Sequence, residues 1–137
     1  MNKVALAYIV TAVAFCALDF AWLGLVAPKF YQAQIGPLLL QTPKLIPAIV
    51  FYALYVAGLV YFCVLPGLDV DSLSQAMLRG ALFGLVAYGT YDLSNLATLK
   101  NWTLQITLVD MGWGCIASAV ASAGGYVLTR FFNSGVT

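Results

Sequence analysis

Four apolar stretches, each long enough to cross a lipid bilayer, dominate this chain, at roughly residues 4–27, 45–66, 76–99 and 104–131. A helix needs about 20 apolar residues to cross a hydrocarbon core of about 30 Å, whereas a membrane-spanning strand needs about half that number. Backbone polar groups must also be satisfied inside the bilayer, so these lengths favour helices. The pattern predicts an all-α, polytopic membrane protein whose four spans form a single transmembrane bundle.

The composition excludes several other classes of protein. Hydrophobic residues make up 63% of the chain and charged residues 8%, far from the usage of soluble domains. The connections are short, so residues 1–137 are predicted to form one transmembrane domain whose partner is the lipid bilayer. The six Lys and Arg residues are scattered, so no nucleic-acid partner is expected. His is absent and the Cys and Met residues match no haem motif, so no cofactor is expected.

The connection between the first two stretches is unusual. Residues 29–43 mix Phe30, Tyr31 and Ile35 with several glutamines and prolines. Such a segment is too apolar for a free loop and too short to span. It is predicted to be an interfacial or re-entrant piece, either as an anchor or as a lid over a site.

The orientation in the membrane is not fixed by charge. Basic residues in the loops usually mark the cytoplasmic side. Here they divide equally, with Lys3, Arg79 and Arg130 on the side of the termini and Lys29, Lys44 and Lys100 on the other.

Three aspartates, Asp19, Asp92 and Asp110, interrupt three of the apolar stretches, and the only other acidic residues are Asp69 and Asp71. A charged residue at the bilayer centre costs about 2.5–3.5 kcal/mol on insertion scales, so intramembrane acids are candidates for function. The three aspartates lie eight or nine residues from span ends that belong to the same membrane face. At 1.5 Å per residue, all three should lie about 12–14 Å below that face, in one layer.

Aromatic and amide side chains lie near these acids at helical spacing or at the same predicted depth. Trp22, Asn95 and Trp113 are each three residues from an aspartate, which places them on the same helix face as the acid. The predicted ligand-binding residues are Asp19, Trp22, Tyr52, Tyr55, Tyr88, Tyr91, Asp92, Asn95, Asp110 and Trp113. Asp92, Asp110 and Asp19 are also the candidates for any catalytic role.

No Lys or Arg falls within the aspartate layer, so salt bridges alone do not neutralise it. Protonation, hydrogen bonds from Tyr and Trp, or a bound cation remain. No metal site is predicted. Any cation held by Asp19, Asp92, Asn95 and Asp110 would be a hard one, since the ligands are all oxygens.

Small residues form strips on the last two spans. Gly80 and Gly84 lie one helical turn apart on the third span, and Gly114, Ser118 and Ser122 follow the same spacing on the fourth. Small residues let helices approach closely in lipid, so both strips indicate helix packing, and one could serve a homodimer contact.

Three motifs together suggest a family. They are Leu18-Asp19-Phe20-Ala21-Trp22-Leu23-Gly24, a longer run from Thr90 to Trp102, and Asp110-Met111-Gly112-Trp113-Gly114. The combination resembles a family of small bacterial inner-membrane proteins catalogued as a domain of unknown function. The resemblance implies a four-helix fold, a multi-pass protein of the bacterial inner membrane, and no established activity.

Three functions therefore compete. The first is proton-linked binding or transport of a small molecule or ion in an aromatic, carboxylate-lined pocket. The second is an intramembrane enzyme, either an aspartate-dyad hydrolase or a lipid-modifying enzyme. The third is a structural membrane subunit with a satisfied polar core. The sequence leaves open whether the protein is an enzyme.

Overall fold

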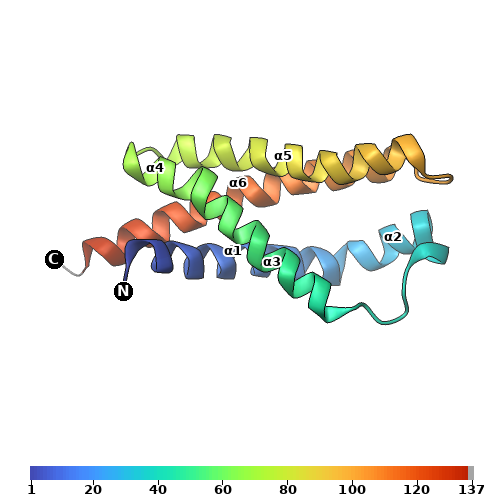
Figure 1. Ribbon diagram of the computed structural model, residues 1–137, viewed down its shortest axis with the longest axis horizontal. Helices are drawn as coiled ribbons and strands as arrows, with labels where there is room; N and C mark the ends of the chain where they lie inside the picture. The colour runs from blue at the N-terminus through green and yellow to red at the C-terminus, as the bar shows by residue number, and fades with distance from the viewer. Residues whose placement is uncertain (136–137) are drawn as a thin grey trace.

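The computed structural model describes residues 1–135, which are almost entirely helical and contain no strand (Figure 1). The prediction of an all-α protein is therefore confirmed. The elements are α1 (Lys3–Leu25), α2 (Ala27–Ile35), a 3₁₀ turn (Gly36–Leu38), α3 (Leu45–Leu59), a π turn (Val60–Val64), α4 (Leu65–Asp69), α5 (Leu73–Thr98) and α6 (Leu104–Ser134).

Three helical stretches are long and apolar enough to cross a membrane: Lys3–Leu25, Leu45–Asp69 and Leu104–Ser134. The second combines α3, the π turn and α4. Helix α5 has 26 residues but is not among them, because polar residues such as Arg79, Thr90 and Asp92 lower its hydropathy. Its crossing of the membrane stays a prediction.

The helices form an elongated bundle in which α1, α5 and α6 run lengthwise and α3 crosses obliquely (Figure 1). Both termini lie at one end, together with the connection between α4 and α5. Helix α2 and the α5–α6 connection lie at the opposite end. Large apolar side chains cover much of the exterior, for example Ile46, which is 77% exposed, as expected of a surface that faces lipid.

Residues 29–43, predicted as an interfacial or re-entrant piece, form most of α2, then the 3₁₀ turn, and then part of the segment that leads to α3. A proline lies in the first turn of α2, where its missing N–H costs nothing. Gln34 then attaches this helix to the start of α6, since its side-chain oxygen accepts from Thr103 at 2.6 Å and its amide donates to Gln105 at 3.2 Å. Where this segment lies relative to the lipid surface stays a prediction.

Glycines allow α5 and α6 to pack closely against each other. A Cβ added to Gly84 would lie 2.1 Å from the carbonyl oxygen of Gly114, and one added to Gly80 would lie 2.5 Å from Ser118. The small-residue strips therefore pack against each other within one chain. The homodimer contact stays a prediction.

The acids at the terminal end of the bundle have basic partners. Lys3 lies 3.2 Å from Asp69, and Arg130 lies 2.5 Å from Asp71. All four side chains are largely exposed, so these pairs contribute little to stability. A basic partner thus distinguishes Asp69 and Asp71 from the three aspartates that lie within the bundle.

Candidate functional site

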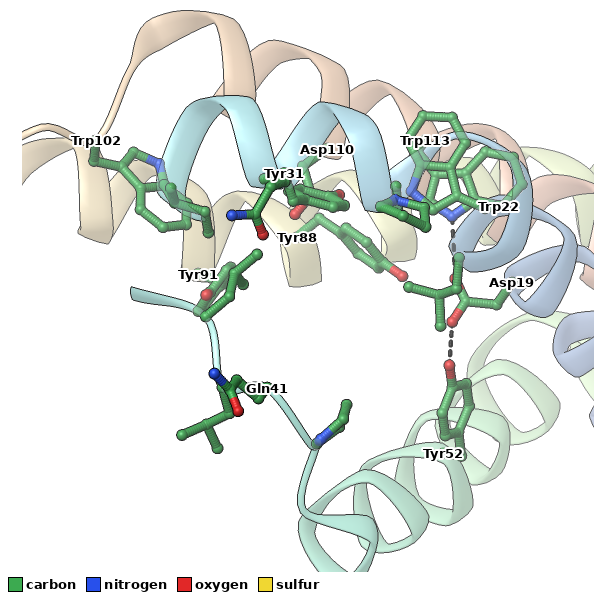
Figure 2. Close-up of a pocket in the computed structure, with 18 residues that line it drawn as sticks. Asp19, Trp22, Tyr31, Gln41, Tyr52, Tyr88, Tyr91, Trp102, Asp110 and Trp113 are labelled. Atoms are coloured by element: carbon green, nitrogen blue, oxygen red, sulfur yellow. Dashed lines mark hydrogen bonds between the residues drawn. The ribbon is translucent and has the colours of Figure 1, made fainter. Parts of the chain in front are cut away.

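An open cavity of about 790 Å³ lies between α1, α2, the segment before α3, and the ends of α3, α5 and α6 that face it (Figure 2). Figure 2 shows its polar and aromatic side chains arranged around a central space. The wall includes two aspartates and two glutamines, Asp19, Asp110, Gln32 and Gln41. Seven aromatic residues also line it: Trp22, Tyr31, Tyr52, Tyr88, Tyr91, Trp102 and Trp113.

Asp19 on α1 is held by donors from two other helices. The hydroxyl of Tyr52 on α3 donates to one carboxyl oxygen, and the indole N–H of Trp113 on α6 donates to the other at 3.2 Å (Figure 2). Asp19 is only 7% exposed, yet each of its oxygens has a donor. The two hydrogen bonds therefore join α1 to α3 and α6 through one carboxyl group.

Stacked indoles form the wall next to Asp19. The rings of Trp22 and Trp113 lie 4.5 Å apart between centroids, with an interplanar angle of 8°. The hydroxyl of Tyr88 points into the cavity on the same side (Figure 2). Because the faces of aromatic rings carry negative potential, this wall favours positively charged groups.

Asp110 on α6 faces the same cavity and accepts a hydrogen bond from the hydroxyl of Tyr31 on α2. Burial raises the pKa of Tyr31, and the bond to Asp110 raises it further. Tyr31 therefore stays protonated as a donor throughout the physiological pH range. Together with the contacts of Gln34, this bond fastens α2 over the site.

Asp92 on α5 does not line the cavity. It is 0% exposed, and neither of its carboxyl oxygens has a donor among the described residues. The carboxyl group of Asp110 lies within hydrogen-bonding reach of it. Two ionised carboxylates cannot bond to each other, so the pair is satisfied only when one of them carries a proton.

The cavity includes seven of the ten residues predicted from the sequence: Asp19, Trp22, Tyr52, Tyr88, Tyr91, Asp110 and Trp113. Three others do not line it. Tyr55 turns into the core and bonds Ser118 at 2.8 Å, Asn95 lies beside Tyr91, and Asp92 lies next to Asp110. Depth and helical spacing placed these three residues near the acids, but neither shows which of them line a cavity.

Four polar or aromatic wall residues were missed by the sequence prediction: Tyr31, Gln32, Gln41 and Trp102. The signal for the first three was the apolar, glutamine-rich character of residues 29–43, which allowed an anchor or a lid and did not show which side chains face inward. Trp102 lies in the connection before α6, and its spacing does not relate it to any of the three aspartates. Its N–H donates to Thr107 at 3.1 Å, and its ring contacts that of Tyr91 edge to face.

The acids do not form a metal-binding cluster. Within residues 1–135, no group of three or more His, Cys, Asp or Glu side chains could hold a metal ion. Both oxygens of Asp19 accept hydrogen bonds from Tyr52 and Trp113, and Asp19 does not belong to the pair of Asp92 and Asp110. No Lys or Arg of the described chain lines the cavity either, so its charged wall residues are all acidic.

A family model described as "Predicted membrane protein (DUF2177)" matches residues 4–127, nearly the whole chain. The chain belongs to this family. DUF2177 is described as a membrane protein family, in agreement with the three apolar helices, and its description states no activity. No curated protein and no solved structure gave a match. The function of this DUF2177 protein therefore has to be argued from the cavity.

Proposed function

We propose that this protein binds a small organic cation in the cavity between α1, α2, α3, α5 and α6. One observation carries the proposal: two aspartates and seven aromatic side chains face the same open cavity, whose described wall has no basic residue. The volume of about 790 Å³ lies within the range of small-molecule sites.

The chemistry of the wall favours a ligand that is both positively charged and partly apolar. A cation over a desolvated aromatic face is stabilised by about 2 kcal/mol. The parallel indoles of Trp22 and Trp113 offer such a face next to the carboxylate of Asp19. Asp110 supplies a second negative group across the same space. An anionic ligand would meet two acids and no cation.

The enzyme hypothesis has one observation in its favour, the close pair of Asp92 and Asp110. An aspartate dyad acts through a water or substrate that both carboxyl groups contact. Asp92 is fully buried and does not line the cavity, so only one carboxyl group of this pair could touch a substrate there. This geometry supports binding better than hydrolysis.

The structural hypothesis is favoured by Asp19, whose donors from Tyr52 and Trp113 join three helices. Such a network could serve only to fix the packing of α1, α3 and α6. A purely structural network does not account for the open cavity next to it, or for Asp110 at the cavity wall. We therefore keep it as the second candidate.

Intrinsic fluorescence tests the proposal directly, since all three tryptophans of the chain line the cavity. We expect benzyltrimethylammonium, titrated into the detergent-solubilised protein, to change the tryptophan emission in a saturable way. Neopentylbenzene has the same shape without the charge and is the matched control. Equal responses to both compounds, or no saturable response to the cation, would contradict cation binding.

We further infer that the protein acts in the bacterial inner membrane, as the motifs around Asp19, Asp92 and Asp110 suggest.

A flux measurement distinguishes binding from transport. Proteoliposomes that contain the protein would accumulate labelled benzyltrimethylammonium faster than empty vesicles if the cavity serves transport. Binding without flux would indicate a receptor or a binding subunit of a larger complex.

A further inference from the structure

Asp92 has no role in cation binding as described so far, and its surroundings require an explanation. Its side chain is fully buried on α5, and both oxygens lack a donor among the residues that the structure describes. A buried carboxylate without donors or a counter-charge is strongly destabilised. Its carboxyl group instead faces that of Asp110 on α6, within hydrogen-bonding reach.

The titratable groups around the pair include no Lys or Arg. Helix α2 contributes Tyr31, which donates to Asp110, and α1 contributes Asp19 at longer range. Helix α5 itself contributes Tyr88 and Tyr91. These groups supply one hydrogen bond to Asp110 and no positive charge, so neutralisation of the pair must come from elsewhere.

We propose that the Asp92–Asp110 pair is a proton-binding site that holds one proton on Asp92, its buried member. The acid O–H of Asp92 then donates to the carboxylate of Asp110, which also accepts from Tyr31. With one proton on the pair, each carboxyl group takes part in a hydrogen bond, and a single negative charge remains on the residue that faces the cavity. Asp92 is thus a positioning residue that acts through Asp110.

This arrangement deepens the proposed cation binding, on which its functional consequence rests. Because the pair retains one proton, two adjacent carboxylates do not repel each other at the cavity wall. It also gives the carboxylate of Asp110 a charge-assisted donor, the stronger kind of hydrogen bond. Asp110 thereby remains available as an anion for the ligand.

Infrared spectroscopy of the ligand-free protein at neutral pH tests the proton site. The chain contains no glutamate and only five aspartates, so few carboxyl groups contribute. We expect a protonated-carboxyl C=O band that shifts on ¹³C labelling of aspartate, vanishes in Asp92→Asn and persists in Asp19→Asn. Absence of the band from the wild type, or its survival in Asp92→Asn, would overturn the proposal. This readout needs no ligand, so its failure is distinct from a failure of cation binding.

Binding of benzyltrimethylammonium then tests the positioning role. Asp92→Leu removes the donor to Asp110, and we expect its affinity to fall about tenfold, the typical effect of one hydrogen bond to a charged group. Asp92→Asn keeps an N–H donor and should bind the probe more tightly than Asp92→Leu. Equal affinities of Asp92→Leu and the wild type, in a protein that remains folded, would overturn the role of Asp92.

Discussion

Gly84→Ala is expected to destabilise the protein by about 3 kcal/mol, at the upper end of the cost of overpacking a well-packed core. The new Cβ would lie 2.1 Å from the backbone oxygen of Gly114 and 2.5 Å from the hydroxyl oxygen of Ser118. Because the first of these is backbone, relief requires a shift of α5 against α6. Thermal unfolding in detergent, followed by circular dichroism, measures the loss.

Gly112→Ala is the matched control for this substitution. It lies in α6, one helical turn or less from Gly114, and an added Cβ there meets no atom within 4 Å. Alanine is favoured over glycine in a helix by about 1 kcal/mol, so the control should leave stability unchanged or raise it. Equal destabilisation by the two substitutions would contradict the close packing of α5 on α6.

The double substitution Asp19→Asn and Asp110→Asn is expected to weaken binding of benzyltrimethylammonium by at least about a hundredfold. Both carboxylates face the cavity, and each is worth about tenfold or more to a nearby cation if the loss resembles that of one charge-assisted contact. Equilibrium dialysis in detergent measures the change. Asp69→Asn, which removes a surface acid at the terminal end of the bundle, is the control.

The same substitutions separate the binding hypothesis from the structural one. If the acids served only to join helices, the double variant would melt at a lower temperature and bind the probe as the wild type does. The donors to Asp19 from Tyr52 and Trp113 make some loss of stability expected in either case. Probe affinity therefore decides the matter.

Several features of the fold could be predicted because they depend on simple geometry. Apolar length indicated the helices, and residue counting from the span ends indicated a shared layer for the aspartates. In the structure Asp19 and Asp110 indeed line one cavity. The spacing of small residues indicated that both helices pack closely against a neighbour, and in the structure Gly84 packs on Gly114.

Other features depend on information that a single sequence does not carry. Counting residues gives the depth of a side chain but not the rotation of its helix, so Asp92 was expected at the wall and is instead buried away from the cavity. Composition left open whether residues 29–43 anchor the protein or cover a site, and the choice of Tyr31 as the donor to Asp110 depends on the path of α2. Tyr55 fits the predicted depth and still points into the core.

The position of a bound cation tests the central claim most directly. We would determine the structure of the protein with 4-bromobenzyltrimethylammonium and locate the bromine by its anomalous scattering. The account predicts one site inside the cavity, with the ammonium group near Asp19 or Asp110 and the ring against Trp22, Trp113 or Tyr88. Bromine found only on the exposed apolar surface of the helices, with the cavity unoccupied at saturating probe, would contradict it.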